Sequence, residues 1–100
     1  MVVEYIRYSI PAQRRREFES AYDDAGGPLE ASAHCRSYEV TRCVEDAASY
    51  VVRIEWDSIE GHEGGFRKSP EFQEFFAAVR PFVGDIEEMR HYELVTPASA

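Results

Sequence analysis

The chain has 100 residues, 44% of them hydrophobic, which predicts one small globular domain at residues 1–95 followed by a flexible tail at 96–100. Its net charge of −8 argues against nucleic acid and anionic membrane surfaces as partners, because both would repel it. It shows neither a basic leader segment nor an apolar run of about 20 residues, so we expect a cytoplasmic protein.

The residue types that bind metals are scattered along the chain. Cys35 and Cys43 fall in one expected strand, where a rise of about 3.3 Å per residue keeps them too far apart for a disulfide bond, so we expect two reduced thiols. No group of His, Cys, Asp or Glu has the spacing of metal ligands, and no glycine-rich phosphate loop follows a strand. The sequence therefore predicts neither a metal site nor a cofactor.

The first third of the chain predicts a strand and a helix. Residues 2–10 alternate between two faces, and only Glu4 is out of place on the apolar one. Residues 12–25 repeat apolar positions at helical spacing. Gly26-Gly27 followed by Pro28 predicts the end of this helix.

Three further strands and two further helices follow. Residues 34–44 and 49–56 alternate and predict a hairpin, and residues 85–95 predict the last strand. After Trp56, the pair Asp57 and Glu60 has the pattern of a capping box for a weak, glycine-rich helix.

The second of these helices has a stronger start signal. Ser69 followed by Pro70 predicts its cap, and phenylalanines then form an apolar stripe until Pro81. The order of elements is β-α-β-β-α-β, which predicts a ferredoxin-like α+β fold with an antiparallel four-stranded sheet and helices on one face.

The other face of the sheet is expected to be mixed in character. Its expected residues are Tyr5, Arg7, Ser9, Glu39, Val51, Arg53, Glu55 and Met89. Such a face suits burial against a second copy in which the charges pair, because an unpaired buried charge costs several kcal/mol. We therefore expect an obligate homodimer.

Trp56 and His62 are the residues expected to carry chemistry. Trp56 ends a strand on the helix-facing side, where it is either core or a flat wall and N–H donor for an aromatic ligand. His62 lies in the glycine-rich helix and is either a surface residue or the base that removes a phenolic proton. We expect His34 to lie on the surface and His91 to have a salt-bridged structural role.

Aromatic residues are dense in the same part of the chain. They form either half of a small core or the lining of a pocket for a flat aromatic substrate. The residues expected to bind such a substrate are Tyr8, Tyr38, Phe66, Phe72, Phe76 and Phe82.

The stretch from residue 55 to residue 76 resembles a known family. A strand ending in Trp56, a short helix with His62, a Ser69-Pro70 cap and a phenylalanine-rich helix resemble the antibiotic-biosynthesis-monooxygenase family. The resemblance covers essentially the whole chain. It implies a homodimeric α+β barrel in which the fourth strand crosses toward the partner, with a cavity between helices and sheet in each subunit.

The resemblance also bears on activity. Haem-degrading members use an Asn, a Trp and a His; the matching positions here are Arg7 or a neighbour, Phe66 and Phe76, so haem degradation is not expected. Members that oxidise phenols to quinones use Asn, Trp and Tyr; Trp56 and a tyrosine match, whereas the chain contains no Asn. Similar domains occur beside globin domains, which leaves a globin-type or other redox partner open.

Two functions follow as alternatives. The first is a cofactor-independent monooxygenase that oxidises an aromatic or polyketide-like small molecule with O2. The second is a non-catalytic module of the same fold that binds a small ligand or a partner protein. An enzyme needs a base that faces the cavity, whereas a binding module needs only walls.

Overall fold

The computed structural model describes residues 1–96 and has the expected order of elements. The strands are β1 (Val2–Ser9), β2 (Cys35–Arg42), β3 (Ser49–Trp56) and β4 (Ile86–Glu93), and the α-helices are α1 (Arg15–Ala31) and α2 (Pro70–Val79). The shorter helical segments are η1 (Ala12–Arg14), η2 (Gly61–Gly65), η3 (Phe66–Lys68) and η4 (Arg80–Asp85). Of the tail expected at 96–100, all but Thr96 lies outside the described residues.

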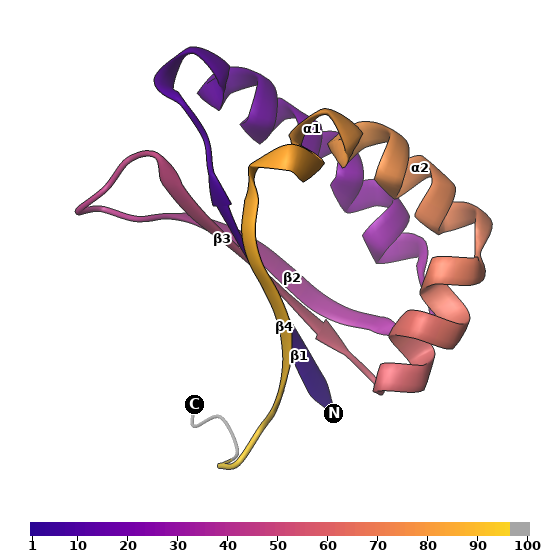
Figure 1. Cartoon of the computed structure of the whole chain (residues 1–100). Coiled ribbons are helices and arrows are strands. Elements are labelled where there is room, and N and C mark those ends of the chain that lie inside the picture. Colours follow the sequence, from indigo (N-terminus) through magenta and orange to yellow (C-terminus); the bar gives the residue numbers. More distant parts are fainter. Residues whose placement is uncertain (97–100) are drawn as a thin grey trace.

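The strands form one antiparallel sheet in the order β2-β3-β1-β4. Both α-helices lie on the same face of this sheet, and the opposite face is left uncovered (Figure 1). This is the predicted ferredoxin-like α+β fold, which is confirmed. Within residues 1–96, no helix combines the length and the apolar character that a membrane span requires.

The core lies between the sheet and the two helices. Alternate residues of β1 and β3 point toward the helices and meet a stripe of buried residues on α1. The largest fully buried side chains of this core are Trp56, Tyr8, Tyr50, Phe18, Phe66, Ile10, Leu29, Ile54 and Val52. The aromatic share of this core is high, so its packing depends on ring-to-ring contacts such as that of Tyr8 with Phe18 (centroids 4.8 Å apart).

Helix α1 continues where the sequence predicts a break. It runs through residues 26–28 to Ala31, so the prediction of a helix end at Gly26-Gly27 is wrong. The stripe of buried side chains extends past the glycines to Leu29, which is fully buried. Burial of a leucine side chain contributes roughly 2 kcal/mol, enough to offset the poor helix propensity of the two glycines.

The segment after β3 also starts differently from the prediction. The Ser58 hydroxyl, 2.8 Å away, accepts the hydrogen bond from the Gly61 N–H, whereas a carboxylate oxygen of Asp57 contacts His34 Nδ1 at 2.9 Å. The capping box expected from Asp57 and Glu60 is therefore wrong. The helix that follows, η2, is a π-helix rather than an α-helix. In contrast, the Ser69 hydroxyl accepts from the backbone of α2, and that predicted cap is confirmed.

The open face of the sheet differs from the prediction at one residue. Met89 is paired with Ile6, and side chains directly opposite each other in a sheet share a face, so Met89 faces the helices. On the open face, the exposed rings of Tyr5 and Tyr92 pack edge to face with centroids 5.3 Å apart. Whether a second copy covers them stays a prediction.

Candidate active site

A cavity of about 180 Å³ lies between the sheet and the segment from η2 to η4. Most of its lining is apolar: Ile6, Ile54, Trp56, Phe66, Phe72, Phe75, Phe76, Val79, Val83, Ile86 and Met89. Its polar lining residues are Glu4, Tyr8, His62 and Arg67. A mostly apolar cavity with a few polar groups is typical of small-molecule sites.

Most of the residues that the sequence singled out lie around this cavity. Trp56, His62, Tyr8, Phe66, Phe72 and Phe76 all line it. Phe82 and Tyr38 lie elsewhere. Phe82 is buried against Phe18, with the Arg14 guanidinium 4.5 Å from its ring centroid. Tyr38 lies on β2 and faces α1, where its hydroxyl donates to Glu30 and its side chain lines a separate groove.

His62 is fixed on three sides. Its ring stacks on the Trp56 indole, with centroids 4.3 Å apart and planes 8° from parallel. Its Nδ1 lies 2.7 Å from His91 Nε2 on β4. Its Nε2 lies 3.4 Å from Arg67 Nε and 3.6 Å from Glu4 Oε1, both longer than the roughly 3 Å of a strong hydrogen bond. The Nε2 atom is therefore only loosely engaged.

The indole of Trp56 also holds Glu4. The Trp56 Nε1–H donates to Glu4 Oε1 over 3.1 Å, and both side chains are buried. Because this N–H is already used, it is not free to donate to a ligand as the sequence analysis envisaged. Trp56 instead positions two other polar side chains, one by stacking and one by a hydrogen bond.

The packing of η2 explains the glycines around His62. His34, paired with Asp57, lies directly against the backbone of this π-helix. A Cβ at Gly65 would overlap the His34 ring. Glycine thus allows the turn to approach the end of β3 closely enough for His62 to reach Trp56, and π-helical turns are found frequently at functional sites.

Burial pushes the two central titratable groups toward their neutral forms. It raises the pKa of Glu4, against the opposing effects of the Trp56 hydrogen bond and of the nearby His91 and Arg67 side chains. It lowers the pKa of His62 to about 4, and Arg67 and His91 act in the same direction. At neutral pH the imidazole of His62 is therefore uncharged, and its 3.6 Å contact with Glu4 is not an ion pair.

The sequence analysis missed Glu4, Arg67 and His91 as site residues. Glu4 gave a signal, because it is the one charged residue on the apolar face of its strand. His91 gave none, because its place beside the cavity depends on the pairing of Glu4 with His91 across β1 and β4. Arg67 is brought in by a short 3-10 turn that has no sequence signature.

Glu4, His62 and His91 also offer three metal-ligand atoms within 4.8 Å of one another. In the structure the two histidines bond to each other at 2.7 Å, closer than two nitrogens bound to one zinc ion at about 2.0–2.1 Å each in tetrahedral geometry. The Arg67 guanidinium beside Nε2 would also repel a cation. The arrangement therefore suits the holding and transfer of a proton better than a metal ion.

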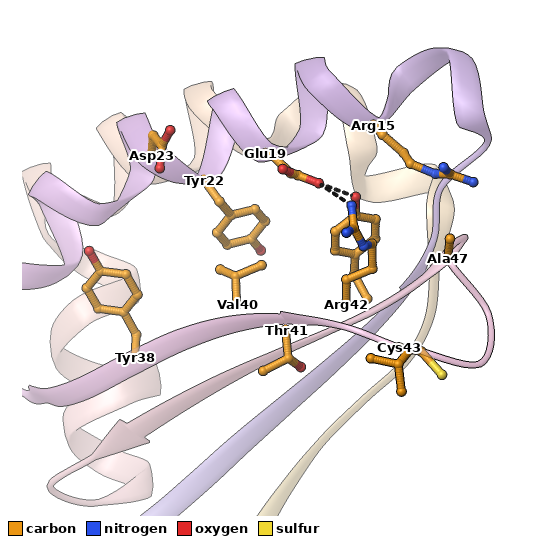
Figure 2. Close-up of a pocket in the computed structure, with 12 residues that line it drawn as sticks. Arg15, Glu19, Tyr22, Asp23, Tyr38, Val40, Thr41, Arg42, Cys43 and Ala47 are labelled. Carbon is orange, nitrogen blue, oxygen red and sulfur yellow. Dashed lines mark hydrogen bonds and ion pairs between the residues drawn. The ribbon is translucent and has the colours of Figure 1, made fainter.

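A larger and more open groove of about 800 Å³ lies between α1 and the β2–β3 hairpin. Figure 2 shows Tyr38, Val40 and Arg42 pointing toward the helix, whereas Thr41 and Cys43 point away from it. Some of the polar groups that meet there are paired: Glu19 accepts from the Tyr50 hydroxyl at 2.5 Å and lies 3.6 Å from Arg42, whereas the Nε atom of Arg15 is buried without a hydrogen-bond partner among the described residues. The groove is open and its lining includes the charged residues Arg15, Glu19, Asp23 and Arg42, so the smaller, mostly apolar cavity is the better candidate for a small-molecule site.

Comparisons with known proteins agree with the fold. A curated relative, the uncharacterized protein YczJ of Bacillus subtilis (strain 168), is 28% identical over 93 residues, which are 93% of this chain and 98% of that protein. The solved structure of Rv0793 from Mycobacterium tuberculosis superposes with a TM-score of 0.78 at 17% identity and covers 98% of both chains.

A second solved structure comes from an oxygenase. A variant of SnoaB, a cofactor-independent oxygenase from Streptomyces nogalater, has a TM-score of 0.78 at 14% identity and covers 96% of this chain and 94% of that one. The family model described as "Antibiotic biosynthesis monooxygenase" matches residues 1–78. The chain therefore belongs to the antibiotic biosynthesis monooxygenase family.

Proposed function

We propose that the protein is a cofactor-independent monooxygenase that oxidises a small phenol with O2 inside the 180 Å³ cavity. The observation that supports this most strongly is a buried, neutral imidazole whose Nε2 is loosely engaged at the polar end of an apolar cavity. Such a group can accept a phenolic proton, which is the step that makes an aromatic ring reactive toward O2. The family and the oxygenase SnoaB support the same reaction class.

The reaction balances without a cofactor. A phenol with a free para C–H loses its O–H proton, and the phenolate transfers one electron to O2. The phenoxyl radical and superoxide combine at the para carbon to form a C–O bond. The O–O bond then breaks as the para C–H proton is lost, which leaves a para-quinone and water. The substrate gives four electrons and O2 takes four, so no redox partner is required.

Two polar residues of the cavity, His62 and Arg67, have direct roles in this scheme, and aromatic residues position the reacting groups. His62 is the base, through Nε2. Arg67, whose Nε lies 3.4 Å from the same atom, stabilises the phenolate oxygen and the superoxide at the polar end of the mostly apolar cavity. Trp56 holds the His62 ring in place by stacking. Phe66 and Phe72 provide walls for the ring of the substrate.

The other residues expected to bind the substrate differ in where they lie relative to the cavity. Tyr8 lines the cavity, but its hydroxyl is 2.6 Å from that of Tyr22 and burial raises the pKa of Tyr8 to about 12, so it serves as a neutral wall. Phe76 is partly exposed and lies where the cavity opens to solvent. Tyr38 and Phe82, which do not line the cavity, have no part in the proposal.

The volume of the cavity favours a compact substrate. Sites for drug-sized ligands measure roughly 300–1,000 Å³, so a cavity of about 180 Å³ suits one or two fused rings better than an extended polycycle. A three-ring substrate would require the half-exposed residues Phe76, Val83 and Met89 to move aside.

Oxygen uptake and quinone formation test the proposal. The substrates are phenol, 1-naphthol and anthrone, which have one, two and three rings. We expect the wild type to consume one O2 per quinone and to prefer 1-naphthol. His62→Gln should lower the rate by about 10²- to 10⁴-fold, because it removes the base. His34→Gln is the matched control, because His34 lies outside the cavity, and it should keep the wild-type rate.

Two results would count against the enzyme. Equal rates in wild type and His62→Gln would show that His62 is not the base. No uptake with any of the three substrates, combined with saturable binding of 1-naphthol, would favour the non-catalytic binding module. One observation favours that second function: the Trp56 N–H and His62 Nδ1 are both already bonded within the protein.

A further inference from the structure

His91 lies between the apolar cavity and a second, open hollow on the surface of the protein. His62 lines the cavity, while His91 lines a shallow, open hollow of about 430 Å³ on the other side. The 2.7 Å contact between His62 Nδ1 and His91 Nε2 connects the two spaces. His91 is half-buried on the edge strand β4, whereas His62 is only 3% exposed.

The contacts of His62 define which ring nitrogen carries the proton. The Nε–H of Arg67 can only donate, and it points at His62 Nε2 over 3.4 Å, so Nε2 bears the lone pair. In the neutral ring the proton is then on Nδ1, from which it donates to His91 Nε2. The lone pair faces the polar end of the cavity, and the N–H faces the edge of the sheet.

The charges around the two rings favour the outer one as the place for a positive charge. A charged His62 would be buried beside the Arg67 guanidinium, and Glu4, the carboxylate within 4 Å of it among residues 1–96, is itself shifted toward the neutral form. The hollow beside His91 is open and is also lined by the acidic residues Asp57, Glu60 and Glu93. Asp57 is already paired with His34, which leaves Glu60 and Glu93 as the carboxylates nearest this opening.

We propose that His62 and His91 form a two-histidine proton path, in which a proton taken from the substrate at His62 Nε2 is held on His91. The proposal rests on the proposed function, for which it supplies the final proton acceptor. As the O–H bond of the phenol breaks, an N–H bond forms at His62 Nε2. The Nδ1–H bond of His62 breaks as an N–H bond forms at His91 Nε2. When the oxygen atom released by O–O cleavage is protonated to water, the proton returns from His91 through His62 by the reverse of these steps.

This path resolves a difficulty in the chemistry of the site. The depressed pKa of His62, about 4, makes that ring a poor final acceptor for a proton from a phenol. Passing the charge one ring outward leaves His62 neutral before and after the step, with only its tautomer changed. The positive charge then lies at the edge of the sheet, where water reaches it.

A spectroscopic test requires no substrate and no turnover. Ring-¹⁵N-labelled histidine in the wild type reports the tautomer and the charge of each ring across a pH titration. We expect His62 to be neutral with its proton on Nδ1, and the first proton added to the pair to reside on His91. A proton on His62 Nε2, or charge appearing on His62 before His91, would overturn the proposal even if the protein proves to be an oxygenase.

A kinetic test follows with whichever phenol the wild type oxidises. His91→Ala should lower the rate by about 10²-fold, and added imidazole should restore part of it by entering the open hollow. More basic imidazoles should restore more. His34→Ala, next to the same segment, should need no rescue. A His91→Ala variant with the wild-type rate and pH profile would refute the path. A wild type that oxidises none of the phenols would refute the proposed function. The ¹⁵N titration would still show whether the two histidines have the tautomer and charge that the path requires.

Discussion

Glu4 and His62 are two buried titratable side chains with opposite pKa shifts in one small space. Burial raises the pKa of the carboxyl and lowers that of the imidazole to about 4. Among the described residues, the carboxylate–imidazole contact of these two groups is the one they make with each other at 3.6 Å, and both depend on Trp56, which donates to one and stacks on the other. Burial of these two polar side chains therefore lowers the free energy of unfolding of the protein.

The first prediction concerns the pH dependence of stability that His62 causes. Its pKa is lowered from 6.5 to about 4 on folding, so the unfolded chain takes up the proton first and stability falls as the pH falls through this window. Such a shift corresponds to about 3 kcal/mol. Urea unfolding at pH 7 and at pH 4 should show that the stability difference between wild type and His62→Gln shrinks by up to this amount at the lower pH. A difference that is independent of pH would contradict the assigned shift.

The second prediction concerns the bond between Trp56 and Glu4. Trp56→Phe keeps an aromatic ring but leaves the Glu4 carboxyl buried without its donor, which should cost about 1–3 kcal/mol of unfolding free energy. Because Glu4→Leu removes the group that needs the donor, the double variant should lose less than the sum of the two single losses. Urea denaturation of the four proteins measures the coupling. Strictly additive losses would show that the bond contributes nothing.

Only part of this site could be predicted from the sequence. Trp56 and His62 stand next to recognisable signals, the end of a strand and a glycine-rich turn. Glu4 breaks an alternating pattern, which shows that the residue is unusual without showing its partner. His91 enters the site through strand register, and register depends on the packing of the whole sheet.

At the scale of elements, the strands follow their local patterns and the helices do so less closely. Strand β3 begins and ends at the predicted residues, because alternation along its whole length matches a half-buried strand. Helix α1 passes through two glycines and a proline, because the buried stripe on its inner face continues beyond them. In α1, tertiary packing therefore outweighs the local sequence signals for a helix end.

The third prediction uses these two glycines as a matched pair. A Cβ at Gly27 meets no atom of the described residues within 4 Å, so Gly27→Ala should raise the free energy of unfolding by up to about 1 kcal/mol. A Cβ at Gly26 would overlap the Tyr38 hydroxyl, which donates to Glu30, so Gly26→Ala should gain less or lose stability. Thermal or urea unfolding compares the two. An equal gain at both positions would show that Tyr38 moves away freely.

At the scale of the whole molecule, the uncovered face of the sheet is the feature that bears on assembly. It carries the exposed pair Tyr5 and Tyr92 beside charged residues, among them Arg53 and Glu55, whose side chains lie 3.8 Å apart. An aromatic pair surrounded by paired charges suits contact with a second copy. The small size of the domain makes additional buried surface valuable.

The fourth prediction is that this face forms a homodimer. Light scattering at micromolar concentration should give twice the mass of the chain for the wild type and the mass of one chain for Tyr5→Glu, which places a charge at the centre of the face. Val44→Glu is the control, because Val44 is 94% exposed and lies outside the sheet. A folded, monomeric wild type would contradict the dimer.

The central claim is that a small phenol binds in the cavity beside His62, and methyl NMR tests it most directly. The wild type, labelled at its isoleucine and valine methyl groups, is titrated with 1-naphthol in the absence of O2. The account predicts shifts at Ile6, Ile54 and Ile86, which line the cavity, and none at Val40 and Val44, which line the groove beside α1. Shifts confined to the two groove valines, or no shifts at any of these residues, would contradict it.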